Sequence, residues 1–152
     1  MNNQGKITYN TKPEEKIVVK NIVPAIEVKT HFKPLKTLIV EDDEYSEKFI
    51  TIRIKKFCKE IIIARTGVEA VEICQNNPDI DLVLMDIRIP EMNGYEAASQ
   101  IRQFNKNVVI IAQTAYALLG DKEKAIEAGC NDYISKPILK DEFYTLIQKY
   151  FK

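Results

Sequence analysis

The stretch Leu82-Val83-Leu84-Met85-Asp86-Ile87-Arg88-Ile89-Pro90-Glu91-Met92-Asn93-Gly94 decides how this chain folds. Its first four residues are apolar, Asp86 ends the run, and a turn containing Pro, Asn and Gly follows. So short an apolar run, closed by turn residues, predicts a strand buried on both faces of a parallel sheet. Asp86 would then stand at the carboxyl end of its strand, where open α/β sheets form their ligand crevices. Taken alone, such an acid could equally cap a helix or charge a loop.

The composition indicates one globular domain with an appended segment. The 152 residues are 45% hydrophobic and 29% charged, and 22 Lys and Arg balance 22 Asp and Glu, so the net charge favours neither nucleic acid nor a membrane surface. Three scattered cysteines (Cys58, Cys74, Cys130) fit neither a disulfide framework nor a metal site, and suit a reducing compartment. Because we find neither a signal peptide nor an apolar run of about eighteen residues, we expect a cytoplasmic chain without a membrane segment.

Residues 1–35 differ from the rest of the chain. Lysines and short apolar clusters alternate there, and Pro13, Pro24 and Pro34 interrupt them. Proline removes a backbone donor and disfavours helix in the preceding residue, so we predict an extended linker with at most one short strand. The single histidine, His31, lies in this segment, and we interpret it as a linker residue rather than a phosphodonor or metal ligand.

From residue 36 onward, short apolar runs alternate with helical patterns. We predict strands at 38–40, 61–64, 82–85, 108–112 and 133–134, and helices at 44–58, 67–76, 94–104, 121–128 and 140–151. Five successive βα units predict a parallel sheet wound on both faces, with right-handed crossovers. We therefore expect the flavodoxin-like (βα)5 fold over residues 36–152, with strand order 2-1-3-4-5.

Polar side chains follow the predicted strands. Glu41 and Asp42 end the first strand, which that fold places beside the third, so both would approach Asp86. Three neighbouring carboxylates repel one another unless a cation lies between them, and Mg²⁺ suits a site with few protein ligands. The alternative is three solvated acids without a metal. Thr114 and Lys136 follow the fourth and fifth strands and offer a hydroxyl and an ammonium group. Together these groups predict phosphoryl transfer onto a carboxylate, for which Asp86 is the candidate.

Four segments carry a family resemblance: 38–42, 85–94, 114–115 and 132–137. Each lies at a predicted strand end, and in this order they resemble the receiver domain of two-component response regulators over about residues 36–152. The resemblance implies a domain that takes a phosphoryl group from a phosphohistidine donor, by a reaction that it catalyses itself, and then changes conformation. Ile89 and Asn93 depart slightly from the pattern, since Met and Asp are more usual there.

The resemblance also implies a role for each matching residue. It makes Asp86 the phosphoacceptor, and it assigns Mg²⁺ to Asp86, to Asp42 directly, to Glu41 through water and to the backbone carbonyl of Arg88. It makes Thr114 and Tyr133 the conformational switch pair. Lys136 would pair with the phosphate, and the Lys136–Pro137 bond would be cis.

Partners and rival functions follow from the same resemblance. The chain is most similar to receivers at the carboxyl end of hybrid sensor histidine kinases. The similarity implies a histidine kinase or histidine phosphotransfer protein as the partner, and it also allows this chain to be the cytoplasmic end of a membrane-bound hybrid kinase. The face of the fourth helix, fifth strand and fifth helix could support a homodimer, and no nucleic-acid contact is expected. No kinase motif is present, so we do not expect an enzyme in the usual sense.

Two enzyme classes that resemble this site lack a required residue or motif here. A haloacid-dehalogenase phosphatase would need a second Asp where Arg88 stands, and a P-loop NTPase would need a Gly-rich loop with Lys and Ser or Thr, which the sequence lacks. A degenerate receiver that serves only for docking stays open.

Overall fold

One parallel sheet organises the molecule. The computed structural model describes residues 33–115 and 118–152, and in them five strands lie in the order β2-β1-β3-β4-β5, as predicted. The strands are β1 (Leu35–Val40), β2 (Cys58–Ala64), β3 (Leu82–Asp86), β4 (Val109–Thr114) and β5 (Asp132–Ser135). The helices are α1 (Glu44–Ile54), α2 (Gly67–Asn76), α3 (Gly94–Phe104), α4 (Asp121–Glu127) and α5 (Lys140–Phe151), with a short 3-10 helix at Lys55–Phe57. Residues 1–32, including His31, lie outside the described residues.

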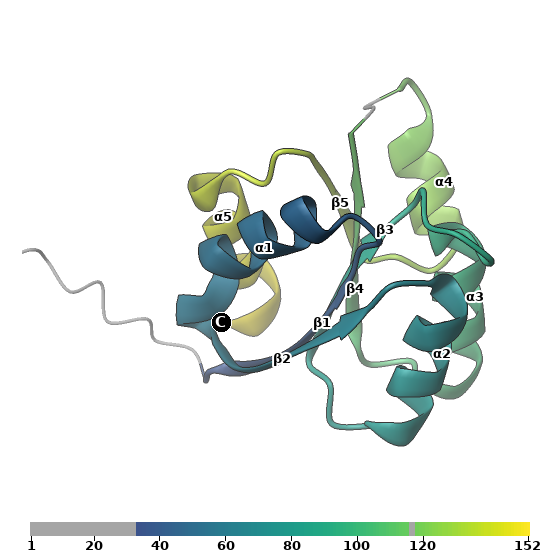
Figure 1. Ribbon diagram of the computed structural model, residues 1–152, viewed down its shortest axis with the longest axis horizontal. Helices are drawn as coiled ribbons and strands as arrows, with labels where there is room; N and C mark the ends of the chain where they lie inside the picture. Colours follow the sequence, from purple (N-terminus) through teal and green to yellow (C-terminus); the bar gives the residue numbers. More distant parts are fainter. Residues whose placement is uncertain (1–32, 116–117) are drawn as a thin grey trace, which may run out of the picture.

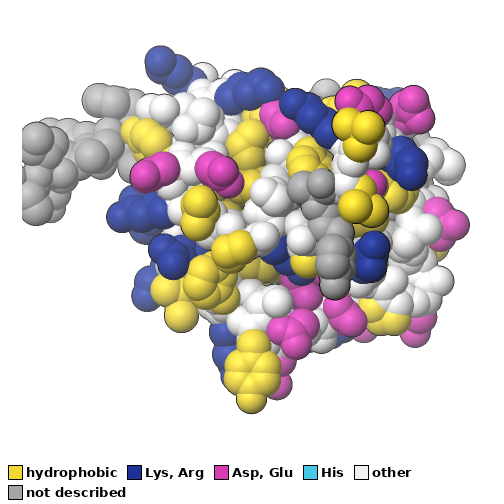
Figure 2. All heavy atoms as spheres, turned by 90° about the horizontal axis from the view of Figure 1, so that it is seen from above, with side chains coloured by type: hydrophobic (Ala, Val, Ile, Leu, Met, Phe, Trp, Pro, Cys, Tyr) yellow, Lys and Arg dark blue, Asp and Glu magenta, His cyan; other side chains and the backbone are white. Residues whose placement is uncertain are grey.

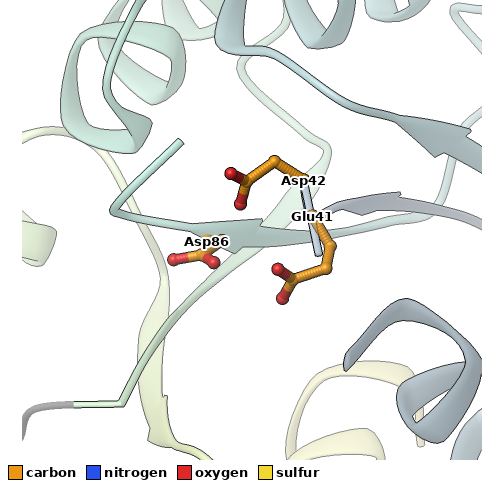
Figure 3. Close-up of side chains that lie close together, drawn as sticks. All are labelled: Glu41, Asp42 and Asp86. Carbon is orange, nitrogen blue, oxygen red and sulfur yellow. The ribbon is translucent and has the colours of Figure 1, made fainter. Parts of the chain in front are cut away.

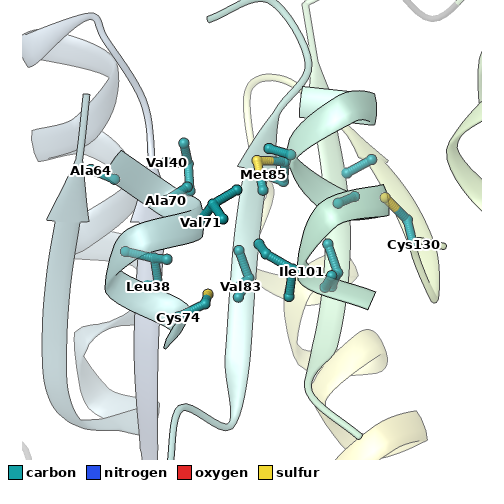
Figure 4. Packing of buried hydrophobic residues seen from close by; sticks show 14 of the residues in the cluster. Leu38, Val40, Ala64, Ala70, Val71, Cys74, Val83, Met85, Ile101 and Cys130 are labelled. Carbon is teal, nitrogen blue, oxygen red and sulfur yellow. The ribbon is translucent and has the colours of Figure 1, made fainter. Parts of the chain in front are cut away.

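Helices cover both faces of the sheet: α1 and α5 lie on one, and α2, α3 and α4 on the other (Figure 1). Side chains of a strand point alternately to the two faces, so each buried strand supplies both cores. Leu38 and Val83 face α2 and α3, where they belong to one apolar cluster (Figure 4). Ile39 and Leu84, the next residues, belong to a second cluster with residues of α1 and α5. The continuous apolar runs of the sequence thus reflect burial on two sides.

Several strands are longer than their apolar runs. β1 begins at Leu35, so the boundary expected between residues 35 and 36 falls inside this strand. Lys36 and Thr37 are polar but buried in it, because Asp79 and Cys58 bind their side chains. β4 likewise continues two residues beyond the predicted 108–112 run, to Thr114. The apolar pattern therefore predicted these strands correctly but made them too short.

The first helix is shorter than predicted. The α-helical backbone ends at Ile54 rather than residue 58, and a 3-10 turn follows. This turn buries the ring of Phe57, and Cys58 then already pairs with Leu35 in the sheet. Packing of Phe57 therefore overrides the helical spacing that continues to this residue.

Three helices begin at the edge of the sheet where the strands end. Side chains cap them: Asp43 Oδ1 accepts from Ser46 N at 2.7 Å, Thr66 Oγ1 from Glu69 N at 3.1 Å, and Asn93 Oδ1 from Glu96 N at 3.0 Å. Such N-caps satisfy donors that lack a partner in the first helical turn. The caps thus fix the loops that follow β1, β2 and β3, and these loops surround the carboxyl edge of the sheet.

Candidate functional site

Three carboxylates gather at the carboxyl edge of the sheet. Glu41 and Asp42 follow β1, and Asp86 is the last residue of β3; one oxygen of each lies within 4.8 Å of the others (Figure 3). Glu41 and Asp86 are buried, with 1% and 5% of their surface exposed, whereas Asp42 is exposed. Asp43 is not part of this group, because its carboxylate caps α1. The structure therefore brings together the three acids selected from the sequence.

One lysine lies against the two buried acids. Lys136 Nζ donates a hydrogen bond to Asp86 Oδ2 at 2.7 Å and another to Glu41 Oε2. Burial raises the pKa of Glu41, and the charge of Asp86 adds to this increase although Lys136 opposes it. Burial alone would lower the pKa of Lys136, but its hydrogen bonds to Asp86 and Glu41 outweigh that effect and raise it. The positive charge of Lys136 alone thus does not compensate the effect of burial on Glu41 and the negative charge of Asp86.

The donor set fits a hard divalent cation. Three ionised carboxylates beside one ammonium group leave two negative charges uncompensated, within a space that a single ion can bridge. All three ligand atoms are carboxylate oxygens, and the exposed Asp42 leaves a side open to water and phosphate oxygens, as Mg²⁺ coordination requires. The arrangement is therefore suited to Mg²⁺.

The loop after β3 fixes Asp86 from its other side. The backbone N–H of Arg88 donates to Asp86 Oδ1 at 2.9 Å, and that of Gly94 donates to Ile87 O at 3.0 Å. A Cβ atom on Gly94 would lie 2.3 Å from the backbone oxygen of Asp86, so this approach of α3 requires glycine. Both carboxylate oxygens of Asp86 are consequently bound, one by the loop and one by Lys136. The side chain of Arg88 is exposed.

Thr114 and Tyr133 lie on the two strands that follow β3 in the sheet, β4 and β5. Thr114 ends β4 and is buried, and its carbonyl accepts from Lys136 N at 2.7 Å. Tyr133 pairs with Ala112 in the sheet, and its hydroxyl is buried without a hydrogen-bond partner among the described residues. The Lys136–Pro137 bond is cis, as predicted. Thr114, Tyr133 and Lys136 therefore lie on adjoining segments at one edge.

Two further residues contribute to this edge and were not predicted. Arg65 follows β2 and donates to Glu41 O at 3.1 Å and to Glu47 Oε2 at 3.0 Å, which ties the end of β1 to α1. Its position directly after an apolar run is the same signal that identified the acids. Gln113 precedes Thr114 and is fully buried beside Asp86. A polar residue inside a strand gives no comparable signal.

Comparison with known proteins defines the class to which this fold and site belong. Residues 37–148 match the family model of the response regulator receiver domain. The chain belongs to this family, whose members are signalling modules. It is 36% identical over 119 residues to the polar-differentiation response regulator DivK of Brucella anthropi, covering 77% of this chain and 96% of DivK.

A second relative is much longer. Hybrid signal transduction histidine kinase I of Dictyostelium discoideum is 37% identical over 122 residues, which cover 75% of this chain but 7% of the kinase. The chain thus spans a small part of that relative.

Solved receiver domains have the same fold. The co-crystal structure of the Saccharomyces cerevisiae histidine phosphotransfer protein Ypd1 with the receiver domain of its downstream response regulator Ssk1 matches with a TM-score of 0.72 and 32% identity, covering 79% of this chain and 90% of that one. A sensor histidine kinase receiver from Pseudomonas aeruginosa, with magnesium coordinated in its active-site cleft, matches with a TM-score of 0.69 and 33% identity, covering 78% and 98%. In the described part of our chain, no helix is long and apolar enough to cross a bilayer.

Proposed function

We propose that this receiver domain accepts a phosphoryl group on Asp86 from a phosphohistidine donor. The observation that carries the proposal is the environment of the Asp86 carboxylate. One of its oxygens accepts from the Arg88 amide and the other from Lys136, beside two further carboxylates that fit Mg²⁺. A carboxylate fixed in this way at an open sheet edge is positioned to attack phosphorus.

The reaction needs little covalent chemistry from the protein. A carboxylate oxygen of Asp86 forms a bond to phosphorus while the phosphorus–nitrogen bond of the donor breaks, and the imidazole keeps the electron pair. We assign the metal to Glu41, Asp42, Asp86 and the backbone carbonyl of Arg88. Bound there, Mg²⁺ supplies the positive charge that neutralises the phosphoryl oxygens. Lys136 adds a fixed positive charge and keeps Asp86 oriented.

A phosphoryl group on Asp86 would alter the surrounding contacts. It brings up to two negative charges and three acceptor oxygens into a region where Lys136 now binds carboxylates. We assign the hydroxyl of Thr114 as a donor to this group and Tyr133 as the ring that follows its movement. The buried hydroxyl of Tyr133, unpaired among the described residues, supports a second conformation. The change would then reach the surface of α4, β5 and α5.

A hollow beside the site supports docking of the donor. It measures about 530 Å³ and is lined mainly by apolar side chains of α1 and of the loop before α5, with Lys136 at its edge. Tyr45 on its rim is 84% exposed. A histidine kinase or histidine phosphotransfer protein that covers this hollow would lie beside Asp86. We propose that the two proteins interact in the cytoplasm.

Self-association through α4, β5 and α5 stays a prediction, which size-exclusion chromatography of the phosphorylated protein would test.

Intact-mass spectrometry after incubation with acetyl phosphate and Mg²⁺ tests this function. We expect the mass to increase by one phosphoryl group, and EDTA to prevent the increase. The alternative, a receiver used only for docking, predicts a folded protein of unchanged mass. The paired environment of Asp86 and the complete set of Asp42, Asp86, Thr114 and Lys136 favour phosphorylation.

A further inference from the structure

Gln113 stands next to Asp86 on the same face of the sheet. The two residues pair across β3 and β4, as do Leu84 and Ile111 two positions earlier. Leu84 and Ile111 belong to the apolar cluster that α1 and α5 cover. Since side chains repeat their direction every second residue, Asp86 and Gln113 also point to that face. Gln113 is therefore a polar neighbour of the proposed phosphoacceptor.

The side chain of Gln113 reaches across the strand that carries Asp86. Its Nε2 lies 3.5 Å from the carbonyl oxygen of Val40, a long hydrogen bond. Val40 belongs to β1, and β3 lies between β1 and β4. Val40 directly precedes Glu41 and Asp42. The amide of Gln113, which pairs with Asp86 across β3 and β4, thus contacts the end of β1 directly before Glu41.

This amide is poorly satisfied for a group so deeply buried. Gln113 is 0% exposed, and its Oε1 has no hydrogen-bond partner among the described residues. Thr37 is equally buried, but its hydroxyl pairs with Cys58 Sγ at 3.3 Å. Burying an unpaired amide oxygen costs free energy that an apolar side chain of the same size does not cost. Fold stability therefore does not explain an amide at this position.

We infer that Gln113 is a positioning residue for phosphorylation: its amide holds the end of β1, and with it Glu41 and Asp42, at the spacing from Asp86 that the reaction needs. The inference rests on the proposed function of Asp86. Gln113 itself touches neither donor nor phosphoryl group in this role, and it acts through the backbone at Val40. Loss of the amide should therefore weaken Mg²⁺ binding and slow phosphorylation without weakening the fold.

The variant Gln113→Met tests this role, since methionine has a similar length but no amide. We expect an unchanged or higher melting temperature, together with an initial rate of acetyl phosphate labelling about tenfold lower and a higher Mg²⁺ concentration for half-maximal rate. Gln113→Asn is a second variant, which keeps an amide too short to cross β3, and it should show the same kinetic defect. A purely structural role predicts the opposite: a lower melting temperature with normal labelling of the folded protein.

Ile111→Val is the matched control, because residue 111 lies on the same strand and face, two positions further from the site. It should lower the melting temperature and leave labelling unchanged. Wild-type labelling rates and Mg²⁺ dependence in a folded Gln113 variant would overturn the inference and leave Asp86 as the acceptor. The increase in melting temperature that Mg²⁺ causes without any phosphodonor gives a second test. An equal increase in wild type and Gln113→Met would overturn the inference even if the wild type accepted no phosphoryl group.

Discussion

Two lysines at opposite ends of the sheet, Lys36 and Lys136, each bind two acidic side chains. Lys36 Nζ lies 3.0 Å from Asp79 and 3.7 Å from Glu60 at the start of β1. The Lys36 side chain is 10% exposed, but those of Asp79 and Glu60 are 66% and 52% exposed. At the other end, the side chains of Glu41 and Asp86 are only 1% and 8% exposed. The same residue types are thus solvated at one edge and buried at the other.

This difference in burial separates a structural cluster from a reactive one. The hydrogen bond from Lys36 lowers the pKa of Asp79, so this acid is easily ionised in the folded protein. Burial raises the pKa of Glu41 although Lys136 is nearby. Water and Lys36 together satisfy the acids at the start of β1, whereas the acids around Lys136 still need positive charge. Of these two edges, we therefore expect the one around Lys136, and not the one around Lys36, to bind a divalent cation.

The largest difference between the two edges should be in phosphorylation. We expect Asp86→Asn to abolish labelling by acetyl phosphate completely, because an amide oxygen is too weak a nucleophile to replace the carboxylate. Asp79→Asn removes an acid that also binds a lysine and should be labelled fully. Intact-mass spectrometry of both variants provides the measurement. Full labelling of Asp86→Asn would move the acceptor to another residue.

Removing each lysine should affect stability in different ways. Lys136→Met leaves Glu41 and Asp86 buried without their cation, and we expect a loss of about 2–3 kcal/mol in the free energy of unfolding in EDTA. Saturating Mg²⁺ should restore part of this loss. Lys36→Met leaves acids that water can solvate, so its loss should be smaller and independent of Mg²⁺. Urea unfolding with and without Mg²⁺ would measure this, and equal Mg²⁺ dependence in the two variants would contradict the comparison.

The reactive edge could be predicted from the sequence because its residues follow apolar runs. Asp86 ends one such run, Glu41 and Asp42 end another, and the order of the strands then determines that they meet. The sequence did not show that Glu41 is buried, since burial of a side chain past a strand end depends on the loops above it. The contact of Lys136 with Glu41 could not be predicted for the same reason, because it also depends on how the loops pack.

The other edge could not be predicted in the same way. Lys36 and Thr37 are polar and precede the predicted strand at 38–40, and their burial depends on Asp79 and Cys58, which lie far along the chain. Gln113 is a related case, since its environment is set by β1 across β3. Hydrophobic periodicity reports apolar contacts, so buried polar residues that pair through tertiary structure remain invisible to it.

Asp42 offers a smaller and more selective test of the cation. Its side chain is exposed, so Asp42→Asn should change the free energy of unfolding in EDTA by less than about 0.5 kcal/mol. Wild type should gain about 1.4 kcal/mol when Mg²⁺ is present at ten times its dissociation constant, and Asp42→Asn should lose most of this gain. Glu60→Gln, at the opposite edge, should keep the full gain. Thermal unfolding with and without Mg²⁺ distinguishes these outcomes, and an undiminished gain in Asp42→Asn would exclude Asp42 as a ligand.

The smallest effect we expect is a pH dependence of opposite sign at the two edges, measured in EDTA. The pKa of Glu41 is higher in the folded state than its ordinary value, because burial disfavours its charge, so the folded protein binds this proton more tightly than the unfolded chain. Its contribution is favourable below the ordinary pKa and is lost as the pH rises through the raised pKa. The pKa of Asp79 is lowered by Lys36, so its contribution is present above its ordinary pKa and is lost as the pH falls through the lowered value.

Substituting each acid by its amide should isolate these two contributions. Relative to wild type, Glu41→Gln should become more stable as the pH rises from the ordinary pKa of glutamate through the raised pKa of Glu41. Asp79→Asn should become more stable relative to wild type as the pH falls from the ordinary pKa of aspartate through the lowered pKa of Asp79. Urea unfolding at a series of pH values gives the difference between each variant and wild type, which removes the acid denaturation common to all three proteins. If both differences had the same sign, the carboxylates would share one environment, and burial would not be what distinguishes the reactive edge of the sheet from the structural one.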